Sequence, residues 1–122
     1  MRGETTEVLL MAPARRDSRL IQGTVDLLIL NALTRGPLHG YAVSAWIRER
    51  TKGELGLDDA ALYQALHRLE HRRLIESEWG MSDNNRRAKF YEITRAGRRR
   101  LAKDSSAWQR YARAVFAVLD RT

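Results

Sequence analysis

The stretch LDDAALYQALHRLEHRRLIESEWGMSDNNRRAKFYEIT, residues 57–94, changes its hydrophobic pattern about halfway along. In the first half, leucines recur at helical spacing and project within about 40° of one direction on a helical wheel. These leucines are Leu62, Leu66 and Leu69. Because Asp58 is a residue type favoured at helix N-caps, the pattern predicts a helix over residues 58–73 with one apolar face.

The second half of the stretch has the composition of a β-hairpin. LIESEWGM (74–81) and AKFYEIT (88–94) contain β-branched and aromatic residues, and the polar segment SDNNRR (82–87) separates them. We therefore expect two short strands joined by a long, basic tip. A helix followed by such a hairpin is typical of the reading helix and wing of a winged helix-turn-helix, provided that two helices precede it.

Two helices are predicted before the stretch. LIQGTVDLLILNALTRG (20–36) has a wide apolar face, which indicates burial on two sides, and Gly36 and Pro37 favour its end. A second helix follows PLHG (37–40) and is broken by the glycines of KGELGL (52–57). The chain thus contains the three helices that precede a wing.

A final helix is predicted over residues 95–122, with Thr94 as its cap. Its apolar residues fall close to a and d positions of a heptad pattern. They are Leu101, Trp108, Tyr111, Val115 and Val118. Since so small a domain has little surface to cover this stripe, we expect a second copy of the chain to cover it in a homodimer. The alternative is that the helix folds back over its own domain.

The predicted fold class is mainly α with a small β-hairpin: a winged helix-turn-helix domain (19–94) plus a long C-terminal dimerisation helix (95–122). Residues 1–18 are expected to be a disordered tail. VLLM (8–11) is too short for the apolar core of a signal peptide, and acidic residues stand where positive charge is needed. Met11 is a second candidate for the start of translation.

The charge balance favours a polyanionic partner. Twenty-two Lys and Arg against 15 Asp and Glu give a net charge of +7, which indicates nucleic acid first and an anionic membrane surface second. The lack of cysteine excludes disulfides, thiolate metal sites and cysteine nucleophiles, and it fits a cytoplasmic protein. VDLLILNAL (25–33) is far shorter than the roughly 20 apolar residues that a membrane span needs.

The face of the 58–73 helix opposite its leucines is polar without being simply charged. Gln side chains can pair with adenine in the major groove, whereas His and Arg can donate to guanine. The residues on this face and its flanks are Ala60, Tyr63, Gln64, His67, Arg68 and His71. The solvated face of an ordinary helix would look similar, so this face alone leaves both interpretations open.

The segment from the hairpin tip into the last helix favours the DNA-binding interpretation, because its charge is almost entirely positive. Between Asn84 and Lys103 there are eight basic residues and a single acid, Glu92. Arginines at a tip suit a narrow minor groove or the phosphates beside it. The residues expected to contact DNA here are Asn84, Asn85, Arg86, Arg87 and Lys89.

Four ordered motifs extend the pattern over most of the chain: GTVDLLILNAL (23–33), GPLHGYAV (36–43), LYQALHRLE (62–70) and NNRRAKFYEITRAGRRRL (84–101). On these motifs the chain resembles the PadR-like winged-helix transcriptional regulators. The resemblance implies a homodimeric DNA-binding repressor whose single C-terminal helix forms the dimer, as in the short branch of the family. The sequence departs at Gln64, where the family often has proline, so an operator preference is not implied.

The resemblance also implies an effector site. In drug-sensing members of the family a tryptophan on the last helix lines an aromatic-binding space at the dimer interface, and Trp108 and Tyr111 are the matching candidates here. The alternative is that Trp108 is a core aromatic of the dimer. A small aromatic effector is therefore a further expected partner.

Catalytic and metal chemistry are not indicated. His67 and His71 have the spacing of two zinc ligands on a helix, but Arg68 follows the first histidine and no third ligand is evident. No phosphate-binding glycine loop or nucleophile constellation is found in the sequence, so we expect neither an enzyme nor a cofactor.

The sequence thus predicts a transcriptional regulator, a repressor that binds an inverted-repeat operator as a homodimer and is released by a small aromatic ligand. Two alternatives stay open. One is a general nucleic-acid module that binds RNA, and the other is a winged-helix module whose basic wing meets an acidic protein.

Overall fold

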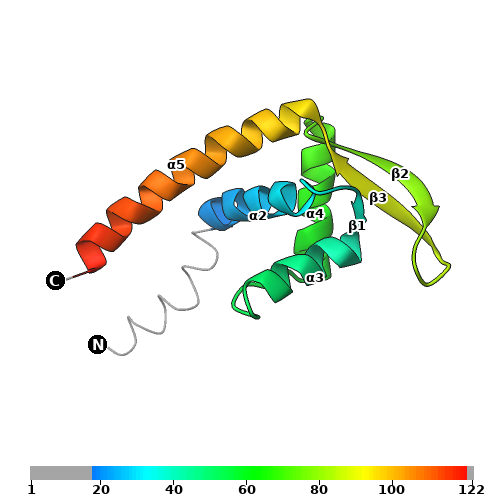
Figure 1. The fold of residues 1–122 in the computed structure, drawn as a ribbon, viewed down its shortest axis with the longest axis horizontal. Helices are drawn as coiled ribbons and strands as arrows, with labels where there is room; N and C mark the ends of the chain where they lie inside the picture. The colour runs from blue at the N-terminus through cyan, green and yellow to red at the C-terminus, as the bar shows by residue number, and fades with distance from the viewer. Residues whose placement is uncertain (1–17, 121–122) are drawn as a thin grey trace.

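A computed structural model describes residues 18–120 of the chain. In this range the elements follow the order α2 (Ser18–Ala32), β1 (Leu38–His39), α3 (Gly40–Arg50), α4 (Asp59–His71), β2 (Ile75–Met81), β3 (Arg87–Ile93) and α5 (Arg95–Leu119). Figure 1 shows α2, α3 and α4 grouped together, the β2–β3 hairpin projecting at one end, and α5 running back over α2. The predicted winged helix with a long C-terminal helix is confirmed. The tail expected for residues 1–18 lies, except for Ser18, outside the described residues.

The wing belongs to a sheet with the strand order β1-β3-β2, in which both pairs are antiparallel. β1 was not predicted, because a two-residue strand is too short to show an alternating pattern. It pairs Leu38 with Tyr91 and thereby joins the start of α3 to the wing. The hairpin tip is shorter than predicted, since Arg87 already pairs with Met81 in the β2–β3 ladder.

Two of the predicted caps are confirmed. The Asp58 carboxylate accepts a hydrogen bond from the Ala61 backbone N–H at 2.8 Å, and the Thr94 hydroxyl accepts one from the Gly97 N–H at 3.0 Å. Each side chain satisfies a backbone donor that the first turn of a helix leaves unpaired. The caps define where the reading helix and the last helix begin.

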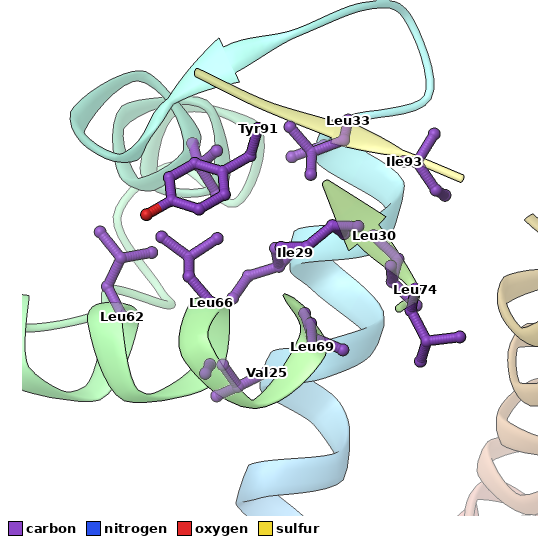
Figure 2. Close-up of a cluster of buried hydrophobic side chains, with 14 of the residues drawn as sticks. Val25, Ile29, Leu30, Leu33, Leu62, Leu66, Leu69, Leu74, Tyr91 and Ile93 are labelled. Atoms are coloured by element: carbon purple, nitrogen blue, oxygen red, sulfur yellow. The ribbon is translucent and has the colours of Figure 1, made fainter. Parts of the chain in front are cut away.

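The core lies where α2, α4 and the sheet meet (Figure 2). The three leucines predicted to face inward are fully buried, with at most 1% of each side chain exposed. Figure 2 shows Val25 and Ile29 of α2 beside α4, and Leu33 of the same helix toward Ile93 of β3. α2 is therefore buried on two sides, as its wide apolar face predicts. Leu101 of α5 also belongs to this core.

Gly97 allows the first turn of α5 to lie against the start of β2. A Cβ atom at this position would overlap the Leu74 carbonyl oxygen and would lie 2.8 Å from Cγ1 of Ile93. The carbonyl belongs to the backbone and cannot rotate away as a side chain could. The close approach therefore requires glycine, and it fixes the point from which α5 leaves the domain.

We expect Gly97→Ala to lower the free energy of unfolding by about 2–3 kcal/mol, because the added methyl group forces α5 away from β2. Gly23→Ala is the matched control: Gly23 lies in α2 with open space around it, so alanine should raise stability by about 0.5–1 kcal/mol. Urea unfolding followed by circular dichroism measures both changes. Equal effects of the two substitutions would show that the contact with Leu74 does not constrain α5.

Candidate nucleic-acid interface

The outward face of α4 presents the polar side chains that the sequence places there. Gln64, His67 and His71 are exposed, and so is the small Ala60 between them and the start of the helix. Tyr63 lies on the flank toward the wing with 49% of its surface exposed. The face therefore combines hydrogen-bonding groups with a low-profile residue that permits close approach to a groove of DNA.

Arg68 differs from its neighbours because it points back into the domain. Its Nη2 lies 2.5 Å from Oδ1 of Asp26, and the two side chains are only 25% and 18% exposed. The ion pair ties α4 to α2, and its partner lies 42 positions earlier in the chain, beyond the reach of a helical-wheel argument. Arg68 thus contributes to the orientation of α4 and does not belong to its exposed face.

The wing tip carries exposed amide and guanidinium groups from Asn84, Asn85 and Arg86. Asn85 has a φ of 63°, a left-handed conformation that asparagine tolerates better than most residues, and it closes the turn. Arg87 is the first residue of β3, and its Cζ atom is 4.7 Å from the centre of the Trp79 ring. This cation–π contact orients the Arg87 guanidinium on the wing surface.

Lys89 lies within the β2–β3 ladder, paired with Trp79, and not at the wing tip. Its Nζ is 3.7 Å from Oε1 of Glu70 on α4, and it also approaches the ring of Tyr91. The other carboxylate oxygen of Glu70 accepts a hydrogen bond from the Ser77 hydroxyl at 2.5 Å. Burial raises the pKa of the Tyr91 phenol, and the negative charge of Glu70 and the neighbouring Tyr63 raise it further. Tyr91 therefore stays neutral beside this pair.

A trough of about 1050 Å³ separates the wing from α3 and the start of α4. Aromatic rings from three elements line it, together with the wing cations; these rings include Tyr41, Trp46, Tyr63 and Trp79. Gly40 forms part of its wall, since a Cβ there would lie 2.8 Å from the Tyr63 hydroxyl oxygen. Sequence analysis did not identify Tyr41, Trp46 or Trp79 as site residues, because the fold alone brings them together.

The opposite face of the wing is acidic. Glu76 lies directly across from Glu92 in the β2–β3 ladder, and Glu78 is two residues further along β2. All three are exposed around a shallow hollow of about 230 Å³ that also includes Phe90. A polyanion is repelled from this face, so the wing can approach DNA only with its tip and its cationic face.

The second half of α5 exposes a row of apolar side chains. Trp108 is 43% exposed, donates a hydrogen bond from Nε1 to Thr24 Oγ1 at 3.4 Å, and packs edge-to-face with Tyr111. Beyond it, the exposed residues are Val115, Phe116, Val118 and Leu119. Leu101, the first residue of the predicted stripe, is instead buried in the core of its own domain. The stripe therefore faces the domain at one end and solvent at the other.

In the described part of the chain, residues 18–120, no cluster of three His, Asp or Glu side chains is arranged to hold a metal ion. No helix within the same range is both long and apolar enough to span a membrane.

Comparison with known proteins identifies the family. The model of the transcriptional regulator PadR-like family matches residues 29–103. A protein from Lysinibacillus sphaericus, uncharacterized protein X, is 31% identical over 91 residues, which cover 75% of this chain and 84% of that protein.

Solved structures of transcriptional regulators are also similar to this chain. A transcriptional regulator from Clostridium thermocellum is 30% identical with a TM-score of 0.71, over 80% of this chain and 94% of its own. A PadR family transcription regulator from Clostridium difficile is also 30% identical, with a TM-score of 0.66 over 78% and 96% of the two chains. Since the family model covers more than half of its length, this chain belongs to the PadR-like family of transcriptional regulators.

Proposed function

We propose that the protein is a repressor that binds an inverted-repeat DNA operator as a homodimer. The observation that carries the proposal is one continuous surface: the exposed polar face of α4, the aromatic trough beside it and the cationic wing tip. Winged helices bind DNA with the reading helix in the major groove and the wing against an adjacent groove or backbone. The surface has the order of groups that this docking needs.

In this arrangement the two parts of the surface have different roles. Tyr63, Gln64, His67 and His71 contact base edges or the backbone from α4, where the amide of Gln64 is suited to adenine. Asn84, Asn85, Arg86 and Arg87 contact phosphates or the minor groove from the wing. The DNA strand between the two grooves crosses the trough, and Lys89 lies at the edge of the trough. Arg68 supports α4 from behind through Asp26.

A homodimer is supported by the apolar row on the second half of α5, from Trp108 to Leu119, which its own domain leaves exposed. We propose the division into a winged helix-turn-helix domain (19–94) and a dimerisation helix (95–122), with the dimer contacts made by Trp108, Tyr111, Val115 and Val118. Two-fold symmetry then presents two α4 helices to half-sites about 34 Å apart, so the operator is an inverted repeat.

An aromatic effector is the second element of regulation that we propose. Trp108 and Tyr111 pack edge-to-face and remain half exposed, so a flat ligand could stack on them at the dimer interface. Release of the dimer from the operator requires that the effector bind more tightly to one dimer conformation than to the other. The favoured conformation must be one in which the spacing between the two α4 helices does not fit the half-sites. Since the target is DNA, the proposed compartment is the cytoplasm.

The first test concerns base reading. Gln64→Ala should relax base choice by about tenfold at one operator position, because a bidentate contact is lost. Arg86→Ala should weaken binding to all duplexes and reduce the slope of log affinity against log salt by about 1. Arg113→Ala controls for net charge and should change neither, because it lies in the second half of α5, and this half of the helix extends away from the hairpin (Figure 1).

Fluorescence anisotropy with a selected duplex, in competition with unrelated DNA and RNA, measures both effects. Equal binding to RNA or to any duplex would favour a general nucleic-acid module. No binding to any nucleic acid would favour a module that recognises an acidic protein.

The second test concerns the dimer. Val118→Glu should convert it to monomers, because Val118 is 78% exposed in one chain and a carboxylate in an apolar interface is costly. The affinity for the operator should fall as the dimer is lost, while the free energy of unfolding of each chain should change little. Sedimentation equilibrium measures the association. A dimer that persists with the same affinity would place the interface elsewhere.

The third test concerns the effector. Trp46→Phe and Trp79→Phe together leave Trp108 as the sole tryptophan. Titration with a panel of planar aromatic cations and phenols should quench its fluorescence and weaken operator binding in parallel. Replacement of Trp108 by Phe should abolish the coupling between ligand and operator. Quenching without any change in operator affinity would indicate binding that has no regulatory role.

A further inference from the structure

We propose that Glu70 is a positioning residue that fixes the angle between the wing and α4, so that the helix and the wing tip engage DNA together. This inference rests on the proposed DNA-binding function and deepens it. The Glu70 side chain touches neither the outward face of α4 nor the wing tip. Its effect on DNA binding is exerted through the placement of the wing.

The Glu70 carboxylate joins α4 to both strands of the hairpin. Oε2 accepts the hydrogen bond from Ser77 of β2 at 2.5 Å, and Oε1 lies 3.7 Å from Nζ of Lys89 on β3. Glu70 is in the last turn of α4, and 33% of its side chain is exposed. One side chain with two oxygens thus bridges three elements, and a hydrogen bond of this length constrains direction as well as distance.

The bridge lies where the wing leaves the core. Ile75 and Tyr91 are buried against the domain, whereas Trp79, which pairs with Lys89, and Met81 at the end of the ladder are 57% and 60% exposed. Apolar packing therefore holds the base of the wing, and the outer part has no such support. The Glu70 contacts with Ser77 and Lys89 are the outermost of the described contacts between α4 and the hairpin that involve polar groups.

The position gives the bridge a mechanical effect. Met81 lies four residues beyond Ser77, and Lys89 pairs with Trp79, two residues before Met81, so at about 3.3 Å per residue the ladder extends roughly 7–13 Å past the two contacts before the tip begins. A tilt of about 10° at the bridge displaces the end of the ladder by roughly 1–2 Å, which is enough to break a hydrogen bond to a phosphate. The contribution of Arg86 to DNA binding should therefore depend on Glu70.

A purely stabilising Glu70 would behave differently. Its loss would lower the melting temperature but would leave the cost of Arg86→Ala unchanged among folded molecules. A double-mutant cycle of Glu70→Ala and Arg86→Ala separates the two roles, since positioning makes the effects non-additive and independence makes them additive. Operator affinity is measured at a temperature where circular dichroism shows every variant to be folded.

We expect Arg86→Ala to weaken operator binding by about tenfold in the unmodified chain and by less than about threefold in the Glu70→Ala background. Glu70→Gln keeps an oxygen that can accept from Ser77 and should retain most of the dependence on Arg86. If Glu70→Ala does not fold, Ser77→Ala removes the same hydrogen bond from the other side and should lower the cost of Arg86→Ala in the same direction. Glu76→Ala removes the same charge from the opposite face of the wing, so it controls for electrostatics and should leave the cost of Arg86→Ala intact.

The outcomes are distinguishable. If the unmodified chain prefers no inverted repeat over unrelated DNA, the proposed function is wrong and this inference falls with it. If the chain binds its operator selectively and Arg86→Ala costs the same factor in both backgrounds, the inference alone is overturned. A smaller cost in the Glu70→Ala background, but not in the Glu76→Ala background, supports it.

Discussion

The burial of one leucine face of α4 against α2 is the constraint on which the rest of the structure depends. Leu62, Leu66 and Leu69 are removed almost completely from water, and each contributes roughly 2 kcal/mol of transfer free energy. Because a helix has a fixed angular repeat, this burial determines that Gln64, His67 and His71 face solvent. Apolar packing alone does not fix the direction of a contact. The ion pair between Arg68 and Asp26 adds a directional contact between α4 and α2, and it therefore limits rotation of α4 about its axis.

The parts of the fold that sequence predicts are those with local signals. Leucine spacing, the caps Asp58 and Thr94, and the composition of two short strands each lie within one element. The parts of the fold that the sequence does not predict are contacts between elements. β1 is too short to show a pattern, Arg68 looks like a surface residue until Asp26 is placed beside it, and Lys89 looks like a tip cation until Glu70 is found. The exposed polar face of α4 was predictable for the same reason as the core, since it lies on the side of the helix opposite the buried leucines.

α5 illustrates the limit of a periodic pattern. The apolar stripe is continuous in sequence, and nothing in its spacing distinguishes Leu101, which is buried in its own domain, from Val118, which is exposed. The difference arises because the domain is shorter than the helix: 25 residues span about 37 Å, and the far half extends past α2 (Figure 1). The close approach of Gly97 to the Leu74 backbone fixes the near half of α5 against the start of the hairpin, whereas the far half has no such contact with the hairpin.

The charges of the protein are divided in a way that net charge does not reveal. Arg68 forms an ion pair with Asp26, and Lys89 forms one with Glu70. The opposite face of the wing carries the carboxylates of Glu76, Glu78 and Glu92. The wing therefore presents positive charge mainly at its tip, next to the exposed face of α4, which carries amide and imidazole groups instead of arginines. Phosphate attraction is long-range and indifferent to sequence, whereas hydrogen bonds to base edges require contact. With the two placed on separate elements, the angle between α4 and the wing decides whether both can act on the same DNA at once.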